Sequence, residues 1–363
     1  MKRIVFVDYL RIFACFLVLL VHASENYYGV VGDANLAGPQ SFLADESDRL
    51  WVSLYDGFSR MAVPLFMIVS AFLLAPMRRE QSSWEFYSKR LKRILPPMFF
   101  FMLLYIFLPT LWGATDMGMA MTDLKRILLN FPAMAGHLWF MYPLIGLYLF
   151  IPIISPWLRE ASAKEERFFI GLFLLSTCMP YLNRWFGELW GECFWNQYHM
   201  LWNFSGYLGY LVLAHYIKTH LDWSRSKRIV WGSLSLIVGA AITIYSFYVQ
   251  AVPGVIHSTP VIELGWAFCT INCVMLTFGA FLLFSCIEKP NAPAYVTDLS
   301  DKSFGIYLVH LLWMPLWVAV FKQDMALPTV AAIPVIAIVT FISSYLTIKI
   351  ASYLPGSKWT VGC

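Results

Sequence analysis

The sequence predicts an all-α, polytopic membrane protein, a bundle of about ten transmembrane helices in a single domain over residues 1–363. Hydrophobic residues make up 59% of the chain and charged residues only 13%, a composition too apolar for a soluble domain. The predicted spans are ten apolar runs. They lie near residues 4–23, 51–77, 94–112, 138–157, 168–182, 200–217, 229–249, 262–287, 303–321 and 329–350.

The basic residues predict the orientation of the bundle. Nineteen of the 26 lysines and arginines fall in the two terminal segments or in the loops on the same side, whereas five fall in the opposite loops. Because cytoplasmic loops carry an excess of lysine and arginine, both termini are expected in the cytoplasm.

The first predicted span carries three ionisable side chains, Asp8, Arg11 and His22. Arg11 and His22 are separated by about three helical turns, so both project from one face, roughly 16 Å apart. Asp8 falls on the same face, where it is expected to pair with Arg11. Ionisable residues inside a span are costly and by default mark a functional site. The alternative is a structural Asp8–Arg11 ion pair with an interfacial histidine.

The second predicted span and the loop after it add basic side chains. Arg60 lies inside the apolar run, with Asp56 four residues before it on the same helical face. The cytoplasmic loop that follows carries a cluster made of Lys89, Arg90, Lys92 and Arg93. Ordinary membrane topology or contact with anionic lipids explains such a cluster. Its alternative use is to bind phosphate groups, which arginine does through two parallel hydrogen bonds.

The third external loop, residues 183–199, interleaves aromatic and hydrogen-bonding side chains. Its members include Trp185, Trp190, Trp195 and His199. An aromatic belt at the level of the lipid headgroups is one interpretation. The other is a sugar-binding surface, because the C–H faces of a sugar are apolar and its hydroxyl groups need hydrogen-bond partners.

Two later spans add further histidines. His137 lies at the outer end of the fourth span, two residues before Trp139, and the ninth span carries Tyr307 and His310 on one helical face. One histidine at a helix end is usually structural, but three helices that each bring one suggest a shared site. The seven cysteines lie mostly in apolar runs without metal-ligand spacing, so neither a metal site nor a disulfide framework is predicted.

Five segments of the chain resemble, in order, the sequence blocks of the acyltransferase-3 family of integral membrane acyltransferases. They are the Arg11–His22 pair with ten residues between, SRMAVPLFMIVSAFLL, FYSKRLKRILPP, GHLWFMYPLIGLYLFIPII and SFGIYLVH. The resemblance covers nearly the whole chain, which is similar in layout to stand-alone O-acetyltransferases of cell-surface polysaccharides. One departure is Ser70-Ala71, where the family commonly has Ser-Gly.

The resemblance implies a multi-pass enzyme of the plasma (inner) membrane. Such an enzyme takes an acyl group, usually acetyl, from cytoplasmic acyl-CoA and transfers it to a hydroxyl of a cell-surface or lipid-linked carbohydrate. Acetyl-CoA is then a co-substrate, and no permanently bound cofactor is expected. The implied partners are acyl-CoA, the glycan acceptor and membrane lipids, without nucleic acid.

Combined with the resemblance, the residues predict a division of roles. His22 is the expected general base, and His137, Trp139 or Tyr307 is the expected donor to the oxyanion. His310 is a further catalytic candidate. The residues expected to bind the CoA phosphates are Arg11, Arg60, Lys89, Arg90, Lys92 and Arg93. Those expected to bind the acceptor are Trp139, Trp185, Trp190, Trp195 and His199.

Two alternatives are open. Direct transfer and a covalent acyl-histidine intermediate are both compatible with these residues. The rival function is a transporter or flippase for a lipid-linked sugar or a small anion. A transporter more often places its site near the midplane between repeated halves, and the sequence shows no internal repeat.

Overall fold

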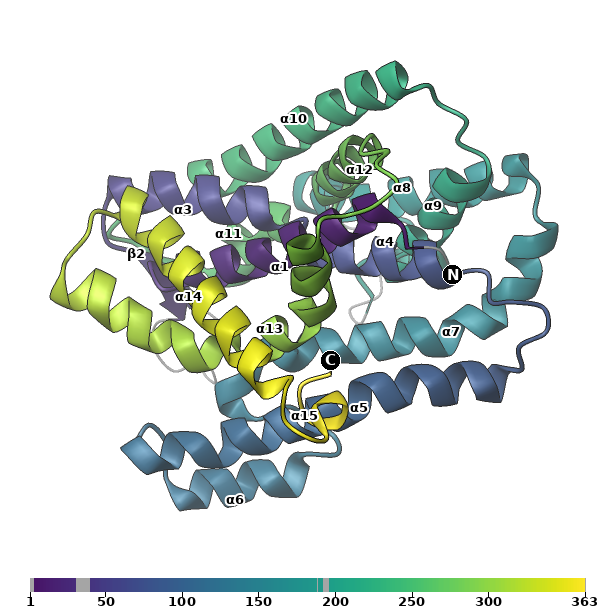
Figure 1. The fold of residues 1–363 in the computed structure, drawn as a ribbon. Helices are drawn as coiled ribbons and strands as arrows, with labels where there is room; N and C mark the ends of the chain where they lie inside the picture. Colours follow the sequence, from purple (N-terminus) through teal and green to yellow (C-terminus); the bar gives the residue numbers. More distant parts are fainter. Residues whose placement is uncertain (1–2, 31–39, 188, 192–195, 363) are drawn as a thin grey trace.

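The protein is a bundle of helices, as predicted (Figure 1). The computed structural model describes residues 3–30, 40–187, 189–191 and 196–362. The α-helices are α1 (Val5–Glu25), α3 (Glu46–Ser59), α4 (Ala62–Leu74), α5 (Ser83–Phe107), α6 (Met117–Arg126), α7 (Met141–Glu160), α8 (Ala163–Phe186), α9 (Tyr207–Thr219), α10 (Arg225–Gln250), α11 (Thr259–Ile262), α12 (Ile271–Ser285), α13 (Ala294–Val318), α14 (Thr329–Ala351) and α15 (Ser357–Thr360). Short 3₁₀ segments η1 (Leu108–Trp112), η2 (Ala133–Phe140), η3 (His199–Phe204) and η4 (Leu264–Trp266) and the π-helical η5 (Ala319–Asp324) extend or join them.

Eight helical segments of the described chain are long and apolar enough to cross a membrane. They are Val5–Glu25, Glu46–Leu74, Ser83–Trp112, Ala133–Glu160, Arg225–Gln250, Leu264–Ser285, Ala294–Asp324 and Thr329–Ala351. Each overlaps a predicted span. The two other predicted spans are also helical, in α8 and in η3 with α9, but do not meet this criterion. The all-α, polytopic class is confirmed, whereas the count of ten and the cytoplasmic termini stay predictions.

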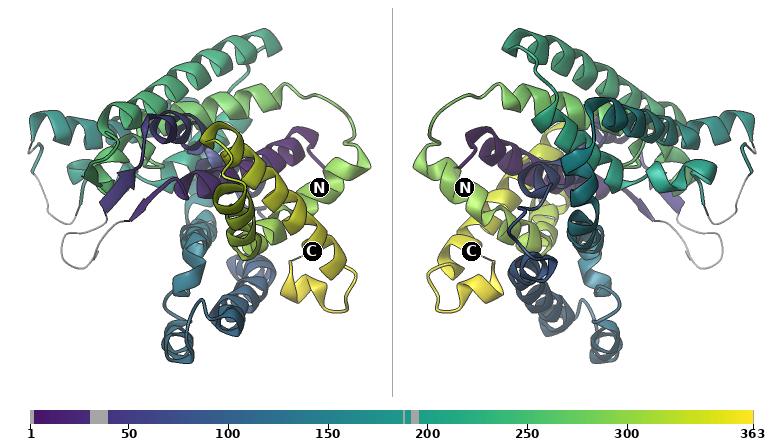
Figure 2. Two further views of the ribbon diagram at one scale, coloured as in Figure 1. Left: turned by 90° about the vertical axis from the view of Figure 1, so that its left-hand side faces the viewer. Right: turned by 90° about the vertical axis from the view of Figure 1, so that its right-hand side faces the viewer.

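Helix α1 is the core helix of the bundle. It packs against α3, α4, α13 and α14, which surround it in Figure 1. The most apolar stretch of 18 residues is 61% buried in α1 but only 17% buried in α10. Helix α10 therefore lies at the periphery, and the segment from α5 to α7 projects from another side of the bundle (Figure 2).

The peripheral helix α10 is held closely against α12 by glycines. A Cβ atom at Gly239 would lie 2.8 Å from both Asn272 O and Leu276 N, and one at Gly279 would lie 2.6 Å from Leu236 N. A side chain at either position would therefore push the helices apart. Small residues have this role at many interfaces between membrane helices.

Local sequence fixes where five of the helices begin. The residue before α3, α5, α6, α8 or α10 accepts a hydrogen bond through its side chain from a backbone N–H in the first turn. These caps are Asp45, Ser82, Asp116, Ser162 and Ser224. Serine and aspartate are preferred there because they satisfy an amide that the helix leaves unpaired.

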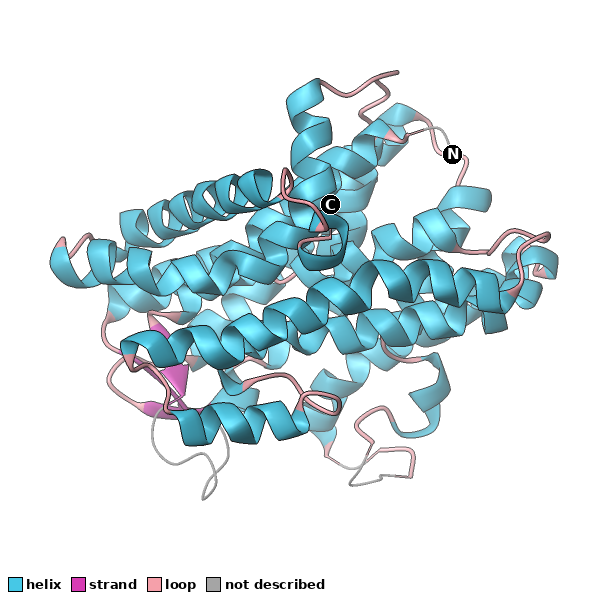
Figure 3. Ribbon diagram, turned by 60° about the horizontal axis from the view of Figure 1, so that its bottom comes forward, coloured by secondary structure: helices cyan, strands magenta, loops and turns pink. Residues whose placement is uncertain are grey.

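Three short antiparallel strands join two connecting segments. Strand β2 (Gln40–Leu43) pairs with β1 (Tyr28–Val30) and with β3 (Ile256–Ser258), at one end of the bundle (Figure 3). Both connecting segments belong to loops that the sequence predicts on the non-cytoplasmic side. Their pairing is therefore consistent with the predicted orientation.

A buried carboxylate joins α8 to the end of α9. Glu166 is fully buried, and its Oε1 lies 2.9 Å from His215 Nδ1 and 3.1 Å from His220 Nε2. Removing one member of a buried charged group costs about 3–5 kcal/mol. We expect Glu166→Ala to lower the thermal unfolding temperature of the detergent-solubilised protein clearly, as measured by scanning fluorimetry.

The control is Glu160→Ala, at the C-terminal end of α7. Glu160 is 81% exposed in a 3.6 Å pair with Arg79, and exposed pairs of this kind contribute about 0–1 kcal/mol. Equal unfolding temperatures for the two variants would contradict the structural role of Glu166.

Candidate active site

Three histidines from three helical segments meet inside the bundle and form what we call the histidine cluster. His22 comes from α1, His137 from η2 and His310 from α13. The ring centroids of His22 and His310 are 5.3 Å apart, those of His137 and His310 4.8 Å, and those of His22 and His137 6.4 Å. His137 and His310 are buried, whereas 20% of the His22 side chain is exposed. The structure thus brings together the three histidines that the sequence singled out.

Glu25 orients His22, and the sequence analysis did not single it out. His22 Nδ1 lies 2.6 Å from Glu25 Oε2. Because a carboxylate oxygen only accepts hydrogen bonds, the neutral imidazole carries its proton on Nδ1 and keeps a lone pair on Nε2. The available signal was the three-residue spacing, which places both side chains on one face of the last turn of α1.

The other two histidines each keep one nitrogen without a partner. His310 Nδ1 donates a hydrogen bond to the Tyr307 carbonyl oxygen at 2.6 Å, which leaves a lone pair on Nε2. His137 Nε2 lies 3.4 Å from the Leu308 carbonyl oxygen, which leaves Nδ1. Both remaining nitrogens are buried and have no partner among the described residues. Buried polar atoms are normally hydrogen-bonded, so this pair indicates a place for a polar ligand atom.

Tyr307 and Tyr105 pack around the histidine cluster. The Tyr307 ring centroid lies 5.5 Å from that of His137, 6.0 Å from that of His310 and 5.9 Å from that of Phe140. Its hydroxyl donates to the backbone carbonyl of His137. Tyr105 of α5 lies on another side, with its ring centroid 5.2 Å from that of His137, and nothing in the sequence singles it out.

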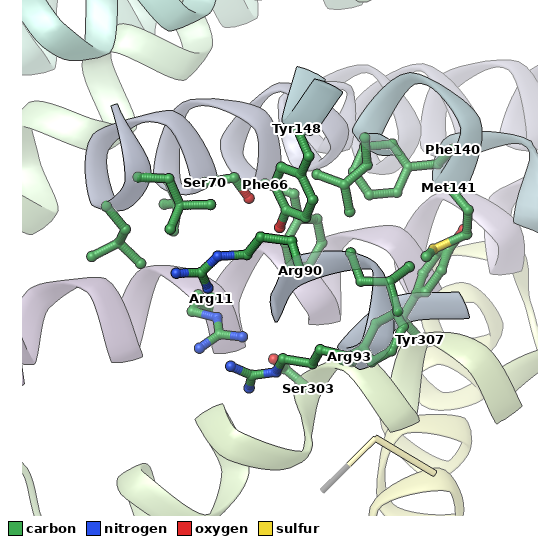
Figure 4. A pocket seen from close by; sticks show the side chains of 16 residues that line it. Arg11, Phe66, Ser70, Arg90, Arg93, Phe140, Met141, Tyr148, Ser303 and Tyr307 are labelled. Atoms are coloured by element: carbon green, nitrogen blue, oxygen red, sulfur yellow. The ribbon is translucent and has the colours of Figure 1, made fainter. Parts of the chain in front are cut away.

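A pocket between α1, α4, α5, α7 and α13 leads toward this cluster (Figure 4). It holds about 930 Å³ of space, its open mouth included. Arg11, Arg90 and Arg93 gather at one end, and the other end is formed by Phe140, Met141 and Tyr307 (Figure 4). Most of the remaining lining is apolar. The pocket therefore joins a cationic mouth to the tyrosine that covers the histidines.

The three arginines of the mouth have no carboxylate partner in the part of the chain that the structure describes. Arg11 and Arg90 are half-buried and Arg93 is exposed. None makes an ion pair with a described residue, and Arg90 Nε is buried without a hydrogen-bond partner there. Three neighbouring guanidinium groups without counter-charge form a site for an anion, because their mutual repulsion is relieved only when an anion binds.

Comparison with known families agrees with this geometry. The family model for the acyltransferase-3 domain, described as "Acyltransferase domain", matches residues 4–349. The chain belongs to this acyltransferase family. No curated protein and no solved structure matches it. The predicted family is therefore confirmed, and with its apolar helices the acyltransferase is a multi-pass membrane protein.

The predicted pairing of Asp8 with Arg11 is wrong. Asp8 instead accepts hydrogen bonds from Arg3 Nε at 2.6 Å and from Ser300 Oγ at 2.7 Å. Arg3 reaches back from the segment before α1, so Asp8 is satisfied without Arg11. The guanidinium of Arg11 is consequently free to face the pocket of the acyltransferase (Figure 4).

Arg60 lies apart from the other predicted phosphate-binding residues. It pairs with Asp56, with Nε 2.6 Å from Oδ1, and donates to the Tyr28 hydroxyl at 3.0 Å. Its guanidinium carbon lies 4.3 Å from the ring centroid of Trp266. Arg60 does not line the pocket, and its charge is balanced where it lies.

The two predicted lysines are exposed on α5. Lys89 shares a shallow hollow beside the mouth with Arg78 and Arg90, whereas Lys92 does not line that hollow or the pocket. Glu80 and Glu85 line the same hollow, so Arg90 connects the pocket to a surface of mixed charge. The phosphate-binding role of both lysines stays a prediction.

The predicted acceptor-binding residues are dispersed. Trp139 lies in η2 and stacks on Phe268, with ring centroids 5.5 Å apart. Trp185 and Trp190 are 71% and 50% exposed, and no described contact joins them to the histidine cluster. His199 is buried, with a partnerless Nδ1 among the described residues. Trp195 lies outside the described residues.

Proposed function

We propose that this acyltransferase moves an acyl group, usually acetyl, from cytoplasmic acyl-CoA to a hydroxyl of a cell-surface or lipid-linked carbohydrate. The observation that carries the proposal is the pocket itself. Three arginines without a described carboxylate partner form its mouth, and Tyr307 at its inner end packs against His137 and His310. An acyl-CoA molecule has the matching polarity, with phosphates at one end and the thioester at the tip of a thin arm.

The pocket suits the donor in the distribution of charge along its length, with arginines at one end and mostly apolar walls beyond them. We assign the phosphates to Arg11, Arg90 and Arg93, which bind them through charge-assisted hydrogen bonds. The apolar walls accept the pantetheine arm, and the thioester comes to lie near Tyr307.

His22 is the base in this proposal. Its Nε2 takes the proton from the acceptor hydroxyl while the hydroxyl oxygen forms a bond to the thioester carbonyl carbon. Glu25 stabilises the imidazolium that results, because its carboxylate accepts a hydrogen bond from Nδ1–H. The C–S bond then breaks and the electron pair leaves with sulfur. Direct transfer and an acyl-histidine intermediate both use the same nitrogen.

Trp139 is the proposed donor to the oxyanion. The other two candidates already have hydrogen-bond partners. The Tyr307 hydroxyl donates a hydrogen bond to the backbone carbonyl of His137, and His137 Nε2 lies 3.4 Å from the Leu308 carbonyl oxygen. The indole N–H of Trp139 has no hydrogen-bond partner among the described residues. A preorganised N–H donor is worth more at the transition state than in the ground state, where less charge lies on the oxygen.

The decisive test is release of free thiol from acetyl-CoA by the purified protein, with and without glycans of defined composition. The proposal predicts glycan-dependent thiol release together with acetylated glycan, detected by mass spectrometry. A transporter or flippase gives no thiol release but moves a labelled glycolipid in vesicles. That second pattern would replace the proposal.

Arg11 supplies a prediction that the corrected pairing makes possible. Because Asp8 has other partners, Arg11→Ala should leave the yield of folded protein unchanged. The variant should raise the KM for acetyl-CoA by about ten- to a hundredfold, since one charge-assisted contact contributes about 1.5–3 kcal/mol. Steady-state kinetics and size-exclusion profiles check both parts.

The contrasting variant is Asp8→Ala. It removes the buried carboxylate shared by Arg3 and Ser300, although Asp301 still pairs with Arg3 at 3.0 Å. The variant should therefore lower the yield, with little effect on the KM of what folds. A loss of yield in Arg11→Ala at unchanged KM would contradict this assignment.

A further inference from the structure

We infer that His310 carries the proton from His22 to the thiolate that leaves when the thioester is cleaved. The inference rests on the proposed function and adds a second proton-transfer residue to it. Its basis is the position of His310, the hydrogen bond that fixes its ring and the buried nitrogen that remains.

His310 packs against both the proposed base and Tyr307 at the inner end of the pocket. Tyr307, which lines the inner end of the pocket, is three residues before His310 on α13, and their ring centroids are 6.0 Å apart. On the other side, the His310 ring stacks on His22 at 5.3 Å with an interplanar angle of 26°. His137 also contacts both, with its ring centroid 5.5 Å from that of Tyr307 and 6.4 Å from that of His22, so His310 is the histidine closer to the base.

The ring of His310 has one nitrogen available for exchange. Nδ1 is committed to the Tyr307 carbonyl oxygen at 2.6 Å, and this bond also sets the orientation of the ring. Nε2 is buried and has no partner among the described residues. An unpartnered lone pair is unfavourable in the interior, so its retention beside a proposed reaction centre indicates a catalytic use.

The proton balance of the reaction supplies that use. The acceptor hydroxyl loses its proton to His22 Nε2 as the C–O bond forms, and the C–S bond breaks with its electron pair on sulfur. His22 then returns to the neutral form when its ring turns out of the stack and Nε2 passes the proton to the unpartnered His310 Nε2. His310 donates the same proton to the thiolate, which leaves as CoA thiol. No oxidant, reductant or further co-reactant is needed.

The test compares two donors that differ in the need to protonate the leaving group. Acetyl-CoA releases an alkyl thiolate, whereas S-acetyl-4-nitrothiophenol releases a much more acidic thiol whose anion leaves without a proton. Glycerol in excess serves as a polyol acceptor, and thiol release is followed for both donors. The test variant is His310→Asn, because the asparagine amide can keep the hydrogen bond to the Tyr307 carbonyl while Nε2 is removed.

We expect His310→Asn to lose on the order of 10²–10⁴ in kcat with acetyl-CoA and to stay within about tenfold of the wild type with the aryl thioester. His22→Asn should be slow with both donors. The matched control is His137→Gln, which keeps an N–H near the Nε2 position and removes Nδ1. Any loss of kcat in His137→Gln should be the same with both donors.

Acetyl-CoA binding, measured by calorimetry, separates catalysis from folding and should be unchanged in His310→Asn. Equal losses with both donors, or full activity with acetyl-CoA, overturn the proton transfer by His310. If only His137→Gln shows a loss that depends on the leaving thiol, the proton transfer belongs to His137, and the proposal for His310 is overturned as well. If the wild type releases thiol from neither donor, the proposed function itself is overturned.

Discussion

Replacing His22 by asparagine is expected to lower kcat by on the order of 10²–10⁴ while acetyl-CoA still binds. Asparagine can keep a hydrogen bond to Glu25 but has no atom at the position of Nε2, which is the only nitrogen of His22 left free by the observed pairing. A base contributes to the transition state and little to ground-state affinity. Single-turnover thiol release and acetyl-CoA binding measure the two effects separately.

Glu25→Gln is the matched control for this prediction. Glutamine can still accept the Nδ1 hydrogen bond but carries no negative charge to stabilise an imidazolium. Its kcat should therefore fall less than that of His22→Asn, with unchanged donor binding. Near-normal turnover in His22→Asn, or a defect explained entirely by lost acetyl-CoA binding, would show that the base lies elsewhere in the cluster.

Reversing two charges at the mouth of the pocket, in Arg90→Glu with Arg93→Glu, is expected to raise the KM for acetyl-CoA on the order of 10²-fold or more. Two charge-assisted contacts are lost, each worth about 1.5–3 kcal/mol, and tenfold in affinity corresponds to about 1.4 kcal/mol. The dependence on acceptor concentration should change little, because both residues lie at the end of the pocket away from the histidines. Initial rates over a grid of both substrates check this.

The control uses the same helix and the same charge. Lys92→Glu reverses the charge of an exposed residue that does not line the pocket. Its effect on the KM for acetyl-CoA should be at least about tenfold smaller than the effect of the double variant. Equal effects would mean that only the overall charge of this surface matters. Normal acetyl-CoA binding in the double variant would mean that the cluster only sets topology.

Helical geometry explains why much of the site was predictable. Arg11 and His22 were placed on one face of a helix by spacing alone, and the structure directs Arg11 to the pocket and His22 to the histidine cluster. The three histidines were expected to share a site because three separate spans each carry one. Periodicity within an element, together with the residue types that each span carries, is information that a sequence contains.

The choice of partner across elements was not predictable in the same way. Asp8 has Arg11 three residues away, yet it pairs with Arg3 and Ser300. Arg60 was predicted with the other basic residues, yet it forms its own group with Asp56. Which rotamer and which partner are chosen depends on the packing of neighbouring helices, which spacing along one helix does not encode.

The inner end of the pocket has a consequence for the membrane as an electrical insulator. Phe140, Met141 and Tyr307 form the end of the pocket away from the arginines (Figure 4), and none of the three clustered histidines lines the pocket. Tyr307 packs against His137 and His310. A cell that stores energy as a proton gradient cannot tolerate an aqueous conduit lined by titratable rings. Because the pocket ends at these side chains, it does not open onto the titratable rings, and the acyl transfer proposed above need not discharge the gradient.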